Sequence, residues 1–213
     1  VHLGIASSEP LIPLLVLLGL PLGAAYSLEP VRLKGRGVLH LITQWLIIFV
    51  GPMLLVAVVM GDRRPWLVAL VAAAYGALQE ASILVNCAED HPEDRAAGVR
   101  TTIVALGLPR GVLLAARLAA AGGAALLAAL AGIACARGAG ASACAALALP
   151  LTAWIAVTAW LSALAISVRR APSATALRMI RRHAKYVPIA VTVVAWSTAL
   201  AVWRIVLQSA ATG

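Results

Sequence analysis

Long apolar segments constrain this chain more than any other feature of its sequence. They occupy roughly residues 10–26, 38–60, 66–85, 111–135, 142–168 and 187–208. A helix needs about 20 predominantly apolar residues to cross the ~30 Å hydrocarbon core of a bilayer. The first segment is short and contains three prolines, so we expect it to be kinked or tilted. The pattern predicts an all-α, polytopic transmembrane helical bundle of about six spans. No long polar linker divides it, so we expect a single domain over residues 1–213.

Basic residues are distributed unequally between the two sides of such a bundle. The first, third and fifth loops carry twelve Lys and Arg residues, whereas the opposite loops carry three. Loops rich in Lys and Arg face the cytoplasm, so we expect an integral protein of the bacterial inner membrane with these three loops inside. Topology and anionic lipid head groups account for the formal net charge of +9. No nucleic-acid partner is needed to explain it.

Acidic residues are concentrated where the third predicted span ends. Four of the eight in the chain fall within six positions, at Glu89, Asp90, Glu93 and Asp94. Pro92 lies among them. Either the span ends near His91, or Pro92 opens a new short turn. Both arrangements still bring Asp90 and Asp94 together.

Asn86, Asp90 and Asp94 recur every four residues, a spacing that places them on one face of a helix. Two carboxylates and one amide oxygen are hard ligands suited to Mg²⁺, which keeps several waters and is shared with substrate phosphates. The spacing therefore makes these three residues candidate magnesium ligands. The alternative is a solvated loop whose acids pair with Arg95 and Arg100.

A basic loop, AYSLEPVRLKGRG at residues 25–37, is expected on the same side of the membrane. Arg32 and Lys34 stand at alternate positions in it, and Tyr26 lies at the membrane edge. Arg and Lys both bind phosphate oxygens, Arg through two parallel hydrogen bonds and Lys as a compact charge. The loop could serve as a topology signal alone. Together with the acidic segment, however, it predicts the two halves of a site for Mg²⁺ and a diphosphate.

Two motifs in these segments resemble those of the UbiA-type intramembrane prenyltransferases. The second aspartate-rich motif of that family, N-x-x-x-D-x-x-x-D-x-x-x-G-x-x-T, is matched by Asn86, Asp90, Asp94, Gly98 and Thr101. The Y-S-x-P-P-x-R-L-K segment is matched from Tyr26 to Lys34, with Glu29 in place of the first proline. The motif order and the intervening spans agree as well, so the resemblance covers nearly the whole chain.

The resemblance implies an all-helical fold of nine spans and the transfer of a prenyl group from a polyprenyl diphosphate to an aromatic or other lipid-precursor acceptor within the membrane. It implies Mg²⁺ as the cofactor, with the metal ligands Asn86, Asp90 and Asp94. The implied catalytic residues are Asp90, Asp94, Arg32 and Lys34. The implied diphosphate contacts are Arg32, Lys34 and Arg100, and we add Tyr26 at the membrane edge as a substrate-binding candidate. The acceptor and the prenyl length depend on cavity shape, which the sequence does not specify.

One departure from the family pattern affects the expected activity. The family's first aspartate-rich motif is absent, and the only acid before Tyr26 is Glu9. Aligned on the motifs, residues 10–26 correspond to the fourth family span, and VHLGIASSEP to the tail of the third. We therefore expect a missing N-terminal segment or a companion chain to supply the rest of the metal site. The alternative function is a non-catalytic UbiA-like membrane fragment that binds lipid or a partner chain.

Two further features lie outside these motifs. Glu80 falls within the third predicted span, and an ionisable group at that depth suggests a functional role. We expect it to bind substrate. The alternatives are a pair with Gln44 or another buried polar group, or a position close enough to the surface to be hydrated. The run RMIRRHAKY at residues 178–186 is typical of a membrane-surface anchor beside anionic lipid.

Overall fold

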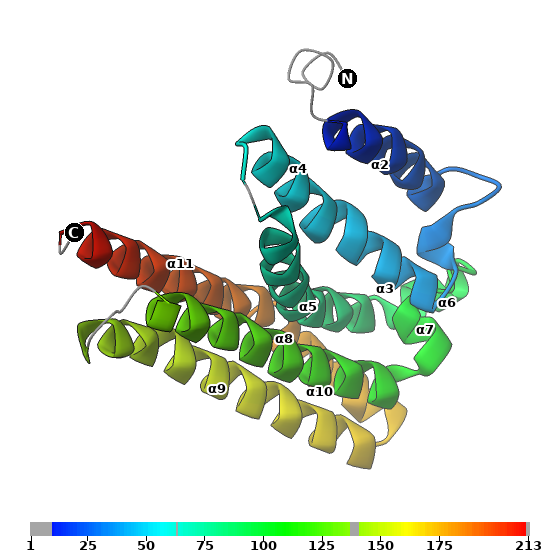
Figure 1. Cartoon of the computed structure of the whole chain (residues 1–213). Coiled ribbons are helices and arrows are strands. Elements are labelled where there is room, and N and C mark those ends of the chain that lie inside the picture. The colour runs from blue at the N-terminus through cyan, green and yellow to red at the C-terminus, as the bar shows by residue number, and fades with distance from the viewer. Residues whose placement is uncertain (1–9, 63, 137–140, 212–213) are drawn as a thin grey trace.

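The computed structural model describes residues 10–62, 64–136 and 141–211 (Figure 1). The opening residues VHLGIASSEP were expected to be the tail of the third family span. Apart from Pro10 they lie outside the described residues, and Glu9 is among them. The described part of the chain is helical and contains no strand, which confirms the predicted all-α class. Its helices are α2 (Leu11–Ser27), α3 (Val38–Gln44), α4 (Gly51–Val59), α5 (Pro65–Glu89), α6 (His91–Ala96), α7 (Thr102–Leu106), α8 (Leu108–Ala136), α9 (Ala141–Arg170), α10 (Ser173–Ala184) and α11 (Val187–Ala211).

Five helices are long and apolar enough to cross a membrane. The first is continuous from α3 through the π-helical turn Trp45–Val50 to α4, and the others are α5, α8, α9 and α11. The sequence predicted six spans, but α2 has only 17 residues. At 1.5 Å per residue it is about 25 Å long, which is less than the ~30 Å of hydrocarbon. The described bundle therefore has five helices that are long and apolar enough to cross a membrane, and one shorter apolar helix.

Helix α5 lies at the centre of the bundle. Figure 1 shows it between the α3–α4 helix on one side and α8, α9 and α11 on the other. Leu78, Leu84 and Val85 on α5 are fully buried and belong to the main apolar core. Residues that follow α5 are consequently held at a defined end of the bundle.

Small residues allow α5 and α8 to approach closely. A Cβ atom added at Gly122 on α8 would lie 2.6 Å from the backbone nitrogen of Leu78 and 2.7 Å from the carbonyl oxygen of Ala74. At the neighbouring Gly123 it would meet the indole ring of Trp154 on α9. Small residues at such crossings are typical of membrane helices, whose backbones pack directly against each other.

We expect Gly122→Ala to destabilise the bundle, because the added methyl group would collide with the α5 backbone, which cannot rotate away. Overpacking of this kind costs about 1–3 kcal/mol. The measurement is thermal unfolding of the detergent-solubilised protein, followed by circular dichroism. Gly132→Ala on the same helix is the matched control, since its Cβ would meet no atom within 4 Å. Equal melting temperatures for the two variants would contradict the close α5–α8 packing.

Candidate functional site

The acidic segment forms a tight helical turn at the end of α5. The backbone amide of Asp90 donates to the carbonyl of Asn86 at 3.2 Å, and that of Asp94 donates to the carbonyl of Asp90 at 2.9 Å. α5 ends at Glu89, and α6 begins at His91 with Pro92 in its first turn. Of the two possibilities that the sequence left open, Pro92 therefore opens a new helix, as proline does at a first helical position. Asn86, Asp90 and Asp94 lie on successive turns, the first two exposed and the third half-buried.

The basic loop follows α2 and contains a strained residue. Arg32 has a φ of 37°, in the left-handed region that residues other than glycine seldom adopt. Its guanidinium is 3.1 Å from the carboxylate of Glu29, in an exposed ion pair. Glu29 is the residue that replaces the first proline of the family pattern. This substitution therefore gives Arg32 an anionic partner within its own loop.

Backbone hydrogen bonds join the basic loop to the segment that follows the acids. The amide of Gly37 donates to the carbonyl of Arg100 at 2.6 Å, and Arg36 and Arg100 form a parallel backbone bridge. Gly37 has a positive φ of 61°, a conformation that glycine adopts without steric cost. The fully buried Thr102 adds a hydroxyl that donates to the carbonyl of Gly37 at 2.9 Å. Two segments more than sixty residues apart are thus held side by side.

His40 and Tyr26 extend this junction into the bundle. His40 is 5% exposed, and its Nδ1 lies 3.4 Å from the Thr102 hydroxyl. The Tyr26 ring stacks on the His40 ring with centroids 6.0 Å apart and planes 23° apart. Sequence reasoning did not identify His40 and Thr102 as the link between the loops, because no motif residue indicates a contact across 62 positions.

The sequence also allowed these acids to form ion pairs with Arg95 and Arg100. The described residues contain no such ion pair. In the described residues, the ion pair made by this acidic cluster joins Glu93 to Arg181 of α10 at 2.8 Å. The carboxylates of Asp90 and Asp94 make no ion pair with any described residue. Both are therefore available to a ligand.

These residues fit a magnesium ion that is shared with a substrate. Residues 10–62, 64–136 and 141–211 contain no group of three His, Cys, Asp or Glu side chains that could enclose a metal. Mg²⁺ does not need such a cage, because it keeps several waters and is bound by one or two carboxylates together with substrate phosphates. Asp90 and Asp94 provide two carboxylates without ion-pair partners, and Asn86 provides an amide oxygen one turn earlier.

Glu80 lies on α5, ten residues before Asp90, and is 1% exposed. It lines an apolar cavity of about 180 Å³ with Leu41, Ile42, Trp45, Ala77 and Leu118. Neither carboxylate oxygen has a hydrogen-bond partner in the described structure, and the same holds for the amide oxygen of Gln44. The Glu80–Gln44 pair that the sequence left open is therefore not formed.

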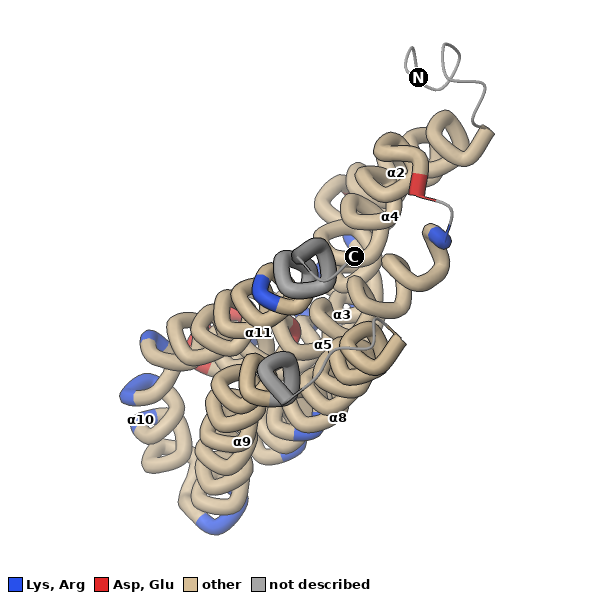
Figure 2. Tube along the Cα trace, turned by 60° about the vertical axis from the view of Figure 1, so that its left-hand side comes forward, with Lys and Arg blue, Asp and Glu red and all other residues tan. Residues whose placement is uncertain are grey.

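The basic run at residues 178–186 falls largely on α10, which packs one face against the bundle. Its apolar residues Ala176, Ile180 and Ala184 are buried against the bundle rather than presented to lipid. Trp160 on α9 donates its indole N–H to His183 Nδ1 at 3.2 Å, and Arg181 reaches Glu93 of α6. α10 is therefore packed beside the acidic turn (Figure 2), and its residues Arg178, Arg181 and Arg182 are exposed.

A search against protein-family models matches residues 2–180 to the UbiA prenyltransferase family. The chain belongs to this family. A search of curated proteins and a search of solved structures find no match. Membership in the UbiA family indicates prenyl transfer as the general activity, and the five long apolar helices agree with an integral membrane protein.

We expect Thr102→Val to loosen the junction between the two loops of this UbiA-family chain. The substitution removes the donor to the Gly37 carbonyl and leaves buried polar groups unpaired, which costs about 1–3 kcal/mol. Hydrogen exchange should accelerate in residues 28–40, and the melting temperature should fall.

Thr152→Val is the matched control, because the exposed Thr152 hydroxyl donates only to a carbonyl of its own helix, that of Leu149. It should leave exchange in residues 28–40 unchanged. If Thr102→Val also left that exchange unchanged, the hydroxyl would not hold the loops together.

Proposed function

We propose that the chain catalyses the Mg²⁺-dependent transfer of a prenyl group from a polyprenyl diphosphate to an acceptor within the membrane. The observation that carries this proposal is the backbone junction between Gly37 and Arg100. It holds the loop that contains Arg32 and Lys34 beside the segment that follows Asp90 and Asp94 in the chain. Cations that bind phosphate and carboxylates that bind Mg²⁺ are the two components that a diphosphate site requires.

Each group has a distinct role in this proposal. Asn86, Asp90 and Asp94 hold Mg²⁺, which when bound acts as a Lewis acid on the diphosphate. Arg32 and Lys34 bind the diphosphate oxygens, with Arg100 and Tyr26 beside them. Arg32 exchanges its exposed Glu29 partner for the substrate, a replacement that costs little because exposed ion pairs are weak.

The reaction that follows is a substitution at the allylic carbon. The carbon–oxygen bond to the diphosphate breaks, the electron pair leaves with the diphosphate, and an electron-rich acceptor attacks the resulting carbocation. Arg32 and Lys34 stabilise the negative charge that accumulates on the departing anion. Apolar walls exclude water, which would otherwise capture the cation.

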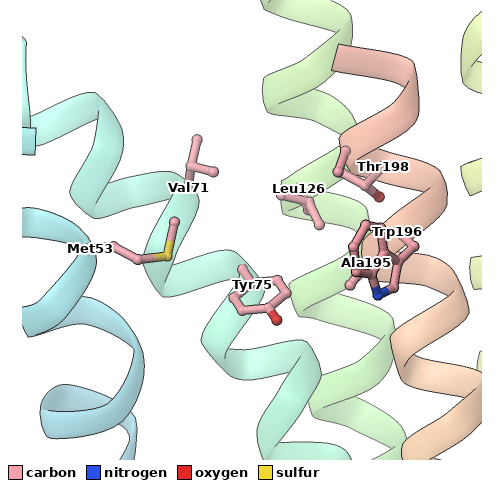
Figure 3. Close-up of a pocket in the computed structure, with 8 residues that line it drawn as sticks. Met53, Val71, Tyr75, Leu126, Ala195, Trp196 and Thr198 are labelled. Atoms are coloured by element: carbon pink, nitrogen blue, oxygen red, sulfur yellow. The ribbon is translucent and has the colours of Figure 1, made fainter. Parts of the chain in front are cut away.

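An apolar cavity further along α5 is proposed to take the prenyl tail. It has a volume of about 490 Å³ and is lined from α4, α5, α8 and α11. Figure 3 shows Met53, Val71 and Tyr75 on one side and Leu126, Ala195, Trp196 and Thr198 on the other. Because α5 also carries the acidic turn at its far end, one helix would position both ends of a polyprenyl diphosphate.

We further propose that the motif loops face the cytoplasm of a bacterial cell. The basic residues of α10 and of the end of α9 lie close together on that side of the bundle (Figure 2). A positively charged surface there would meet anionic lipid head groups.

A second candidate function is a non-catalytic UbiA-like chain that binds lipid or a partner. One observation favours it: Arg32 already forms an ion pair with Glu29. The first aspartate-rich motif of the family is not among residues 1–213. A preceding segment or a companion chain that carries the missing aspartates would make the assembly catalytic. The two functions differ in whether diphosphate is released after it is bound.

Binding of geranylgeranyl thiodiphosphate, which resists cleavage, tests the metal assignment. We expect binding by the nanodisc-reconstituted chain to require Mg²⁺ and to be lost with EDTA. Asp90→Asn and Asp94→Asn should each weaken it at least tenfold, because each removes a carboxylate that would hold Mg²⁺. Asp62→Asn is the control, since Asp62 lies before α5 at the opposite end and accepts from the Arg64 amide.

Release of diphosphate from geranylgeranyl diphosphate then separates the two candidate functions. Mg²⁺-dependent release that Asp90→Asn abolishes supports the transferase. Binding without release under all acceptors supplied supports the non-catalytic alternative. Metal-independent binding that survives both aspartate substitutions would overturn the site assignment.

Glu29→Gln tests whether Glu29 competes with substrate for Arg32. We expect the substitution to tighten thiodiphosphate binding by up to about fivefold, because an exposed ion pair contributes at most about 1 kcal/mol. The matched control is Glu93→Gln, which breaks the comparably exposed pair with Arg181 and should leave the affinity unchanged. Weaker binding in Glu29→Gln would show that Glu29 supports the loop rather than competes.

A further inference from the structure

Helix α11 carries a continuous apolar stripe on the outside of the bundle. The stripe consists of Ile189, Val193, Trp196 and Leu200, and all four side chains are exposed. Successive members are three or four residues apart, so they share one face of the helix. Together with Leu149 of α9 they line a groove of about 700 Å³. Because α11 is long and apolar enough to cross a membrane, this groove is exposed to the hydrocarbon of the bilayer.

The same face of α11 begins with an aromatic ring and a cation. Tyr186 stands three residues before Ile189 and is 51% exposed. The Nζ atom of Lys185 lies 4.9 Å from the centroid of the Tyr186 ring, in a cation–π contact. The exposed Arg182 is three residues before Lys185, a spacing that makes the two side chains neighbours on the surface of a helix. Two cations and a phenol hydroxyl therefore stand at the head of the groove.

These cations have no acidic side chain to neutralise them. Residues 95–213 contain no Asp or Glu, although most of the Lys and Arg residues of the chain lie there. The ion pair of α10 joins Arg181 to Glu93, which precedes this stretch. Arg182 and Lys185 form no ion pair with any described residue. The head of the groove is therefore complementary to an anionic group.

The length of the groove matches one acyl chain of a phospholipid. Leu200 follows Ile189 by eleven residues, which is about 16.5 Å along the helix axis. The hydrocarbon of one leaflet is half of the ~30 Å core, or about 15 Å deep. A phospholipid whose phosphate lies beside Lys185 would thus place one acyl chain along the whole stripe.

Two other occupants fit the groove less well. Chains in one membrane share an orientation, so a symmetric pair through α11 would bring both Lys185 ends together, where like charges repel. A polyprenyl diphosphate is held through Mg²⁺ by carboxylates, and the described lining of the groove contains none. Trp196 also borders the cavity proposed for the prenyl tail (Figure 3), but the two linings share no other residue.

We propose that this groove binds one anionic phospholipid, whose phosphate contacts Arg182 and Lys185 and whose acyl chain lies along the apolar stripe. Arg binds phosphate oxygens through two hydrogen bonds and Lys as a compact charge. The Tyr186 hydroxyl can donate a further hydrogen bond to the head group. The inference does not rest on the proposed function, because no residue of the two motif loops lines the groove.

Quenching of tryptophan fluorescence by brominated lipids tests the proposal, because Trp196 is 74% exposed within the groove. The chain is placed in phosphatidylcholine nanodiscs that contain increasing fractions of brominated phosphatidylglycerol, which is anionic, or of brominated phosphatidylcholine. The Trp196 signal is the difference between wild type and Trp196→Phe. Phosphatidylglycerol should quench half of this signal at a mole fraction about fivefold lower, the factor that one Lys or Arg contributes beside anionic lipid. Equal half-quenching fractions would overturn the proposal.

Paired charge variants separate a defined site from the general basicity of this surface. Arg182→Gln combined with Lys185→Gln should remove the preference for phosphatidylglycerol and leave quenching by brominated phosphatidylcholine unchanged. The matched control is Arg169→Gln combined with Arg170→Gln, which removes two exposed cations at the other end of α10, about 18 Å away. That separation exceeds the Debye length of about 8 Å at physiological ionic strength, so the preference should persist. A preference that survives the first double variant, or that both lose equally, would refute the site.

Three further measurements identify the occupant. Geranylgeranyl thiodiphosphate added with EDTA, which empties the proposed Mg²⁺ site, should not relieve the quenching; relief would assign the groove to a prenyl diphosphate. Nanodiscs loaded with one chain or two should show equal quenching, and weaker quenching with two would assign the groove to a second copy. Ile189→Trp in the Trp196→Phe background moves the probe to a residue that lines the groove alone. The preference for phosphatidylglycerol should reappear there, and its absence would place the lipid outside the groove.

Discussion

The hydrogen bond from the Gly37 amide to the Arg100 carbonyl is the interaction on which the candidate site depends. It forms between main-chain groups, so it joins the basic loop to the acidic segment without using the charged side chains of either. The buried hydroxyl of Thr102 reinforces it by donating to the Gly37 carbonyl. Buried backbone groups without partners are costly, and this cost keeps the two segments together. The charges of Lys34, Asp90 and Asp94 are consequently left for a ligand.

A single helix, α5, arranges the remaining chemistry along its length. Its last turn leads into the acidic turn, its middle carries the buried Glu80, and its first half lines the larger apolar cavity through Val71 and Tyr75. A rigid central helix gives these groups a fixed order and spacing. The close contact at Gly122, where α8 approaches the α5 backbone, holds that helix in place. Stability and site geometry therefore depend on the same packing.

Hydropathy and motif spacing predicted most of the fold and part of the site. The long spans were found to within a few residues, because the free energy of placing a segment in hydrocarbon depends mainly on its own composition. α2 was found equally well, since the predicted segment 10–26 differs from the helix Leu11–Ser27 by one residue at each end. The charge of residues 178–186 predicts a membrane-surface anchor, and this stays a prediction. The structure adds that Ile180 on the apolar face of α10 is buried against the bundle.

The sequence by itself determined the helical class, the long spans and the four-residue spacing of Asn86, Asp90 and Asp94, because each follows from interactions between near neighbours in the chain. Only the tertiary structure decided that Gly37 meets Arg100, that Arg181 reaches Glu93, and that Glu80 has no partner. These outcomes depend on which helices pack together and at what distance. Contacts between distant segments leave no periodic pattern in the sequence, so three-dimensional packing is needed to reveal them.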